Sequence, residues 1–214
     1  MTKKHEVHNL IILDESGSMD SIKKTIIQGF NEIVQTVKGI EKEFTDQEHF
    51  ISLVTFNGLG QKLLHFIDPV NKLELIDETR YRPDACTPLY DAMGFSLVKL
   101  RQLLEEKTDY NVLVTILTDG EENASKEYTG IAIKKLIEEL KLNRWTFTYI
   151  GADHDVEKFA LSLSITNTMT FEKNEDAMKN MFVKEKAARS NYSRKIRLNE
   201  ATEDNFYETE AIKK

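Results

Sequence analysis

The sequence predicts an α/β protein with a doubly wound, mostly parallel central sheet of about six strands and helices on both faces. Two observations predict this class. Short segments rich in β-branched and aromatic residues alternate along the chain with longer segments whose apolar residues recur with helical period. Several of the short segments are apolar at both odd and even positions, which is typical of parallel strands that helices cover on both sides.

Six segments are candidate strands, and the last of them has the weakest pattern. The segment at residues 62–67 follows the turn N-G-L-G closely and is followed by Pro69. We therefore expect it to pair in a hairpin with the strand before it and to be the one antiparallel edge strand of the sheet. The candidate strands are residues 7–13, 50–56, 62–67, 111–117, 145–151 and 168–172.

Three segments between these strands carry an apolar stripe at intervals of three and four residues, which is typical of helices that pack on a sheet. A further helix is expected to begin near Asn174 and to continue into the basic part of the C-terminal region. The three stripes are Ile22, Ile26, Phe30, Ile33, Val34 and Val37, then Leu89, Met93, Leu97, Leu100 and Leu104, and finally Ile133, Leu136, Ile137 and Leu140.

Composition narrows the class of protein. With 214 residues, of which 40% are hydrophobic and 30% charged, the chain is long enough for one large domain with a substantial core. The net charge of -7 argues against nucleic acid as a partner, because phosphate binding needs a positive surface. The chain has no apolar segment long enough for membrane insertion, and its start lacks the apolar core of a secretory signal. We therefore expect a cytoplasmic protein, and we assign no oligomeric state.

The pattern of charge divides the chain into a domain at residues 1–183 and a charged C-terminal helix extension or tail at residues 184–214. In the extension, a basic half at residues 184–197 precedes an acidic half at residues 200–210. One interpretation is a solvated helix with a loose tail, and the other is a contact segment for another protein.

Polar residues follow the first candidate strand and the strand at residues 111–117, at the point where each ends. Asp14, Ser16 and Ser18 are spaced two residues apart, so their side chains point the same way in an extended or gently turning chain. Asp119 follows the second of these strands. Ligands of open α/β sheets bind beyond the carboxyl ends of the strands, so Asp14 and Asp119 share a crevice if the two strands are neighbours. Thr87 precedes Pro88 and the start of a helix, in a loop that can reach the same edge.

Asp14, Ser16, Ser18, Thr87 and Asp119 together offer two carboxylates and three hydroxyls, with no imidazole or thiolate. Such hard oxygen donors suit Mg2+ and, as alternatives, Mn2+ or Ca2+, and they disfavour zinc. Two carboxylates neutralise a divalent ion, so a carboxylate from a partner could complete its coordination. A simpler interpretation is that the hydroxyls only cap helices, and a third is that the site is vestigial.

Three residues near this set have a less specific pattern. Cys86, the single cysteine, is expected to be a small buried residue rather than a reactive thiol. Glu121 and Glu122 are expected on the rim of the crevice, either as part of a solvated loop or as groups that select basic surroundings in a partner.

The order D-x-S-x-S, then threonine, then aspartate resembles the von Willebrand factor A domain with a metal-ion-dependent adhesion site, and the chain looks like the stand-alone bacterial and phage members. The resemblance covers roughly residues 5 to 172. It implies the sheet order 3-2-1-4-5-6, with the site above strands one and four. It also implies that Ser16, Ser18 and Thr87 bind the metal directly or by switching, while Asp14 and Asp119 often act through water.

We therefore expect a non-enzymatic module that binds a divalent metal and grips an aspartate or glutamate carboxylate of another protein through the bound Mg2+. The alternative is a metal-dependent phosphatase or hydrolase on a similar α/β fold, because a carboxylate after the first strand also serves aspartyl-phosphate chemistry. Phosphatases that resemble haloacid dehalogenases carry D-x-D at this position, where the present chain has Ser16 in place of the second aspartate.

Overall fold

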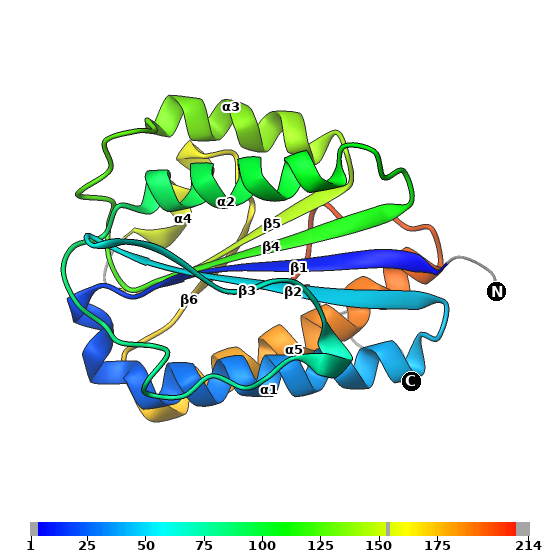
Figure 1. Cartoon of the computed structure of the whole chain (residues 1–214), viewed down its shortest axis with the longest axis horizontal. Helices are drawn as coiled ribbons and strands as arrows, with labels where there is room; N and C mark the ends of the chain where they lie inside the picture. The colour runs from blue at the N-terminus through cyan, green and yellow to red at the C-terminus, as the bar shows by residue number, and fades with distance from the viewer. Residues whose placement is uncertain (1–3, 153–154, 209–214) are drawn as a thin grey trace.

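The computed structural model describes residues 4–152 and 155–208 and contains a single six-stranded sheet (Figure 1). Its strand order is β3-β2-β1-β4-β5-β6, and every neighbouring pair is parallel except β2 and β3. The predicted order and the antiparallel edge strand are both confirmed. The strands are β1 (His5–Asp14), β2 (Gln47–Asn57), β3 (Gly60–Pro69), β4 (Tyr110–Thr118), β5 (Trp145–Gly151) and β6 (Asn167–Thr170).

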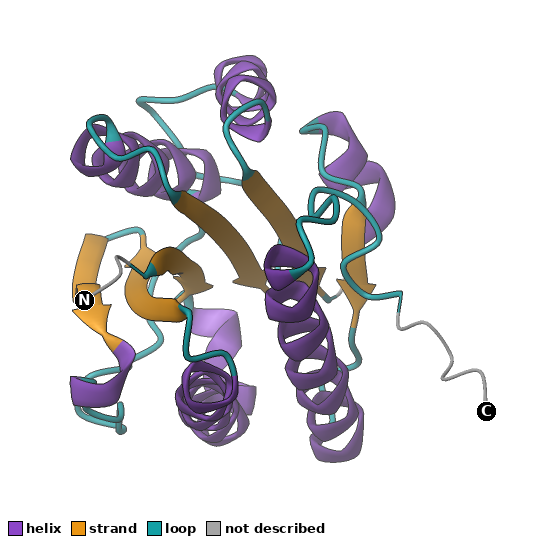
Figure 2. Ribbon diagram, turned by 90° about the vertical axis from the view of Figure 1, so that its right-hand side faces the viewer, coloured by secondary structure: helices purple, strands orange, loops and turns teal. Residues whose placement is uncertain are grey.

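Helices cover both faces of the sheet. Figures 1 and 2 show α1 and α5 on one face and α2, α3 and α4 on the other, so the molecule has three layers. Two short 3-10 helices, η1 (Gly17–Ile22) and η2 (Val70–Lys72), follow β1 and β3. The α-helices are α1 (Lys23–Glu43), α2 (Leu89–Leu104), α3 (Gly130–Lys141), α4 (Val156–Ser162) and α5 (Glu175–Arg197).

The central strands are apolar throughout because each contributes to two separate cores. Leu10 and Ile12 of β1 pack with α2, α3 and α4, whereas Ile11 and Leu13 pack with α1 and α5. All four side chains are buried. The apolar pattern that predicted a parallel sheet covered on both sides therefore has this direct structural cause.

Two helices of the lower layer in Figure 1 approach each other closely at a glycine. A methyl group placed on Gly29 of α1 would lie 2.0 Å from two ring atoms of Phe182 in α5. No other residue type fits there without displacing the ring, so Gly29 sets the separation of α1 and α5.

A buried ion pair fastens α5 to the sheet. Arg189 lies 2.7 Å from Glu185 one turn earlier, and both side chains are almost fully inaccessible to solvent. The guanidinium also donates to Asn9 Oδ1 of β1 and to Thr115 Oγ1 of β4, at 2.9 and 2.8 Å. The basic part of α5 is therefore packed against the sheet as part of the domain, although it carries many charges.

The segment after α5 returns to the sheet. Thr146 donates to the carbonyl of Thr202, and Asn167 accepts from the backbone N–H of Phe206, whose ring is buried. The interpretation of the C-terminal extension as a solvated helix with a loose tail is therefore wrong for residues 184–206. Residues 209–214 lie outside the described part of the chain, and the boundary between residues 183 and 184 stays a prediction.

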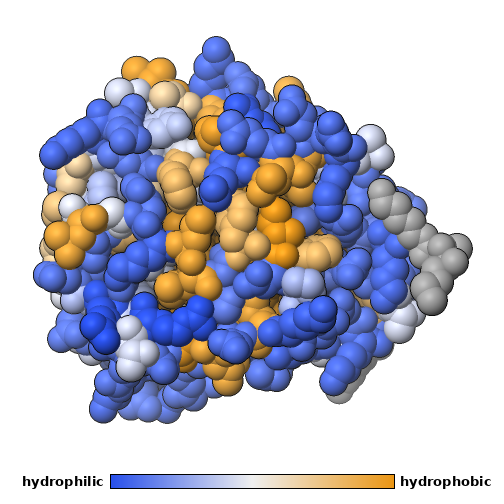
Figure 3. All heavy atoms as spheres, in the orientation of Figure 1, coloured by the Kyte–Doolittle hydropathy of each residue, from blue (hydrophilic) through white to orange (hydrophobic). Residues whose placement is uncertain are grey.

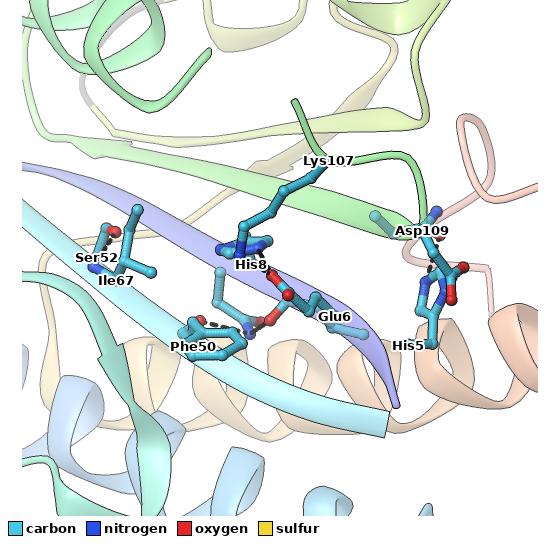
Figure 4. A network of polar contacts seen from close by, with 11 residues as sticks. His5, Glu6, His8, Phe50, Ser52, Ile67, Lys107 and Asp109 are labelled. Atoms are coloured by element: carbon cyan, nitrogen blue, oxygen red, sulfur yellow. Dashed lines mark hydrogen bonds and ion pairs between the residues drawn. The ribbon is translucent and has the colours of Figure 1, made fainter. Parts of the chain in front are cut away.

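At the opposite end of the strands from η1, an ion pair and the hydrogen bonds of two histidines hold the start of β1. Lys107 and His8 both contact Glu6, and His5 pairs with Asp109 at 2.7 Å (Figure 4). The imidazole of His8 stacks on the ring of Phe50 in β2. These contacts fix the end of the sheet remote from the five predicted metal ligands.

The surface at the β3 edge is partly apolar. Figure 3 shows hydrophobic side chains gathered over the middle of this face. Among the exposed large hydrophobic residues is Leu63 of β3, which is 40% exposed. Within the described residues, no helix is long and apolar enough to cross a membrane.

Candidate metal centre

Asp14, the last residue of β1, is buried and held by two donors. Parallel pairing sets Leu13 opposite Leu117, so Asp14 lies beside Thr118 at the end of β4. Its Oδ1 accepts a 2.7 Å hydrogen bond from the backbone N–H of Ser16, and its Oδ2 accepts one from the Thr118 hydroxyl. Burial raises the pKa of Asp14 to about 6, although the hydrogen bonds from Thr118 and Ser16 act in the opposite direction. A buried carboxylate so placed is stabilised by a nearby cation.

Ser16, Ser18 and Asp119 form a continuous chain of contacts. The hydroxyls of Ser16 and Ser18 lie 3.1 Å apart, and the Ser18 hydroxyl donates to Asp119 Oδ1 at 2.7 Å. Ser16 is the residue before η1, yet its side chain makes no capping hydrogen bond. Ser18 lies inside η1, and the N-cap of α1 is Ile22, which makes no side-chain capping hydrogen bond either. The interpretation that Ser18 only caps the first helix is therefore wrong.

Thr87 lies at the same edge of the sheet. Its backbone N–H donates to Asn123 Oδ1 at 3.0 Å, and its carbonyl accepts from the backbone N–H of Asn123 at 3.2 Å. A methyl group placed on Gly120, the residue after Asp119, would lie 3.9 Å from Thr87 Oγ1. The N-cap of α2 is Pro88, and no side chain caps it, so Thr87 stands just before the helix with a hydroxyl that does not cap it.

The five predicted ligands therefore meet at one end of β1 and β4. Hydrogen bonds join Asp14 to Ser16, Ser16 to Ser18 and Ser18 to Asp119, and Thr87 lies beside Gly120, the residue after Asp119. That they bind a metal stays a prediction.

Glu15 does not belong to this cluster, but it holds the neighbouring loop in place. As expected from alternation, its side chain points away from the serines, and Oε1 accepts from Lys62 Nζ at 2.9 Å and from the backbone N–H of Arg82. Its carbonyl accepts from the N–H of Asp84, while the hydroxyl of Tyr81 donates to the carbonyl of Asp14. These contacts fasten the loop that leads to Thr87 onto the end of β1.

Glu122 has a structural role that neither sequence interpretation anticipated. Its carboxylate accepts from the backbone N–H of Tyr90 in the first turn of α2 at 2.9 Å, and from the N–H groups of Ala124 and Ser125 at 2.8 and 2.7 Å. It therefore joins the loop after Asp119 to the helix after Thr87. The expectation that Glu122 is a solvated or partner-selecting rim residue is wrong, whereas Glu121 is exposed as expected.

Cys86 is exposed, so the expectation of a buried residue is wrong. The cause is the path of its loop, which runs along the surface before Thr87. One side of the thiol faces Gly58, where an added methyl group would lie 2.4 Å from Cys86 Sγ.

The donors present fit a hard divalent cation. Within residues 4–152 and 155–208, no group of three or more histidine, cysteine, aspartate or glutamate side chains is arranged to hold a metal ion. An ion at this edge would therefore depend on the hydroxyls of Ser16, Ser18 and Thr87 as much as on the two carboxylates. Oxygen-only sets of this kind suit Mg2+, Mn2+ or Ca2+.

Two residues that sequence reasoning missed also contact the cluster. Thr118 donates to Asp14 and stands directly before Asp119, so its place in T-D-G was a usable signal. Lys173 forms an ion pair with Asp119 Oδ2 at 2.9 Å, and it comes from the segment between β6 and α5. No local pattern in the sequence links Lys173 to this edge of the sheet.

Comparison with known proteins is consistent with this geometry. Residues 10–184 match the family model of the von Willebrand factor type A domain. The comparison with curated proteins gave no match.

Several solved structures share the fold at low sequence identity. A von Willebrand factor type A protein from Catenulispora acidiphila is 18% identical, with a TM-score of 0.54 over 88% of this chain and 43% of that chain. The pilus adhesin SpaC from Lactobacillus rhamnosus GG is 13% identical, with a TM-score of 0.57 over 87% of this chain and 30% of that chain. The chain thus spans less than half the length of either protein.

A third structure was described with a metal. The manganese-loaded TRAP protein of Plasmodium vivax is 15% identical, with a TM-score of 0.51 over 84% of this chain and 74% of that chain. At these identities the likeness concerns the fold alone.

Proposed function

Because the chain belongs to the von Willebrand factor type A domain family, we propose that it is a protein-interaction module that depends on a divalent cation. The ion is held by Asp14, Ser16, Ser18, Thr87 and Asp119, and Mg2+ is its identity in the cell, with Mn2+ or Ca2+ as substitutes. When bound, the ion supplies a positive centre that attracts an aspartate or glutamate carboxylate of a partner protein.

The observation that carries this proposal is the contact between Ser18 and Asp119, extended by Ser16 toward Asp14. It gathers oxygen donors from the ends of two neighbouring strands around one point. The buried Asp14 carboxylate supports the proposal further, because burial without a cation disfavours its charged form. The description of the TRAP protein as manganese-loaded is consistent with a divalent ion in a domain of this fold.

The residues around the five ligands have a supporting role in this proposal. Glu15 and Glu122 hold the loops that carry Thr87 and Asp119, so the ligands are positioned before an ion arrives. Preorganisation of this kind lowers the entropic cost of binding. Domains of this family are generally interaction modules without enzymatic activity, and we do not propose the alternative phosphatase or hydrolase activity.

Two parts of the expectation rest on sequence alone and are kept as proposals. They are a cytoplasmic location and a bacterial or phage origin. The partner's contacting group is proposed to be a carboxylate, since the ion and both nearby helix starts favour negative charge.

Affinity capture from the native cell tests the proposal. Tagged wild-type protein is compared with Asp14→Ala, each in Mg2+ and in EDTA, and Glu106→Ala is the matched control because Glu106 is an exposed carboxylate beyond the far end of α2. We expect a partner that is retained only by the wild-type protein and by Glu106→Ala, and only in Mg2+. A partner retained equally by Asp14→Ala in EDTA would contradict the proposal.

A further inference from the structure

Lys173 places an ammonium group directly on one of the proposed metal ligands. Its Nζ lies 2.9 Å from Asp119 Oδ2, and the carboxylate is fully inaccessible to solvent while the lysine side chain is 23% exposed. The other oxygen of Asp119 accepts the hydrogen bond from Ser18. Both oxygens of Asp119 are thus engaged, one by a hydroxyl and one by a cation that belongs to the chain itself.

The backbone on either side of Lys173 is fixed, so its ammonium is held near the site. Phe171 is buried and donates its N–H to the carbonyl of Gly151 at 3.0 Å. Asn174 caps α5, because its side chain accepts from the N–H of Ala177 at 2.8 Å. Lys173 lies between these two anchors, so the effective concentration of its ammonium at Asp119 is high.

The Lys173 ammonium and a divalent ion cannot both bind Asp119 favourably, because of their positive charges. Asp14 and Asp119 offer two negative charges, which a divalent ion neutralises alone. An ammonium that stays on Asp119 adds a third positive charge within the same few ångströms and repels the ion. Asp119 is inaccessible to solvent, so water screens this repulsion only weakly.

We propose that Lys173 is a built-in competitor for the divalent cation at Asp119. In the ion-free protein its ammonium compensates the buried carboxylate, and ion binding displaces it. The competition sets the concentration of Mg2+ above which the module can bind a partner. This inference rests on the metal centre of the proposed function and adds its regulation.

The effect of Lys173 on the affinity for the metal depends on the fraction of ion-free molecules in which its ion pair with Asp119 forms. If the ion pair forms in about 90% of ion-free molecules, it raises the apparent dissociation constant of the ion about tenfold. Removing the ammonium therefore tightens metal binding, although it removes a favourable contact from the ion-free protein. If Lys173 had a purely structural role, its replacement would leave the metal affinity unchanged or weaken it.

Titration calorimetry with Mn2+ tests the proposal on three variants. Lys173→Met removes the charge at similar length, Lys173→Arg keeps it, and Lys179→Met is the matched control on α5, where Lys179 is paired with Glu175. We expect Lys173→Met to bind Mn2+ roughly tenfold more tightly than wild type. Lys173→Arg and Lys179→Met are expected within about twofold of wild type, because both keep a positive charge beside Asp119.

Thermal melts of the same variants separate competition from a structural role. In EDTA, Lys173→Met is expected to melt below the wild type, because Asp119 loses its counter-charge. In saturating Mn2+ the difference should vanish or reverse. An equal loss in both conditions would overturn the proposal, since it would assign the ion pair a structural role only.

These measurements distinguish failure of the proposed competition from failure of the proposed metal centre. Equal Mn2+ affinity of wild type and Lys173→Met overturns the competitor and leaves the metal centre intact. If neither protein binds Mn2+, both the competitor and the proposed metal centre are overturned. A partner captured independently of metal by proteins that do bind Mn2+ overturns the partner mechanism and leaves the competition at Asp119 in place.

Discussion

Ser18 Oγ donates a 2.7 Å hydrogen bond to Asp119 Oδ1, although the two residues are 101 positions apart in the sequence. The parallel pairing of β1 with β4 makes this contact possible, because it brings the carboxyl ends of both strands to the same edge of the sheet. The loops that follow the two strands then lie at the edge of the sheet where the five oxygen donors meet.

Glu122 should be essential to the arrangement of these loops. Glu122→Ala removes the acceptor of three backbone N–H groups, so we expect a loss of about 2–3 kcal/mol in the free energy of unfolding. Weaker Mg2+ binding should accompany it, because Thr87 is positioned by the same loop. Urea unfolding and calorimetry measure both quantities. Glu121→Ala is the control, and an equal effect of the two substitutions would contradict the role of Glu122.

The close approach of α1 and α5 predicts opposite effects at two glycines of one helix. Gly29→Ala places a methyl group against the Phe182 ring and should destabilise the domain by about 1–3 kcal/mol. Gly39→Ala meets no atom within 4 Å and should stabilise it by roughly 0.5–1 kcal/mol, because alanine is the better helix former. Urea unfolding distinguishes the two variants. An unchanged free energy of unfolding in Gly29→Ala would show that α1 and α5 can move apart without loss of stability.

The buried ion pair of α5 predicts a large effect of removing one partner. Arg189→Met leaves Glu185 as an uncompensated buried charge, so we expect a loss of about 3–5 kcal/mol. Replacing both residues, as in Glu185→Leu with Arg189→Met, should recover most of that loss. A double-mutant cycle in urea checks this, and strictly additive effects would rule out coupling between the two residues.

Acid should destabilise the domain through His49. Burial and, to a lesser extent, the positive charge of Arg189 lower the pKa of His49 to about 3, whereas an unfolded histidine titrates near pH 6.5. Between these values the unfolded chain binds a proton that the folded chain does not, so stability is lost as the pH falls below about 6.5. The slope for one proton is at most about 1.4 kcal/mol per pH unit.

Urea unfolding from pH 8 to pH 4 measures this slope in wild type and in His49→Gln. We expect a shallower decline in the variant, whatever the pH-independent cost of the substitution. Burial also lowers the pKa of His8 to about 4, so part of the decline should persist in the variant. Identical slopes would mean that His49 is not buried as a neutral imidazole.

Much of the fold could be predicted because hydrophobic periodicity is a local signal. The segment at residues 145–151 coincides with β5, since its apolar and β-branched residues fill both cores. The edge position of β3 was visible in the turn before it and the proline after it. The gathering of Asp14 and Asp119 followed from where parallel strands end.

What could not be predicted depends on contacts between distant loops. The role of Glu122 requires knowing that the first turn of α2 faces the loop after Asp119, and the ion pair of Lys173 requires the path of the chain after β6. The exposure of Cys86 depends on how far its loop stands out from the sheet. None of these relationships leaves a periodic pattern in the sequence, because each arises from tertiary packing alone.

The proposed divalent cation at the ends of β1 and β4 should stabilise the folded protein, and thermal unfolding of wild type and Asp14→Asn measures this effect. Melts are recorded at pH 8 in EDTA and in Mg2+ at about a hundred times its dissociation constant. Ligand binding at that ratio adds about 2.7 kcal/mol, which for a domain of this size raises the melting temperature by roughly 5–10 °C.

We expect this rise for wild type and no rise for Asp14→Asn. In EDTA the variant should melt no lower than wild type, because the substitution removes a buried charge whose pKa burial raises. The same rise in both proteins, or in neither, would contradict binding of a cation through Asp14.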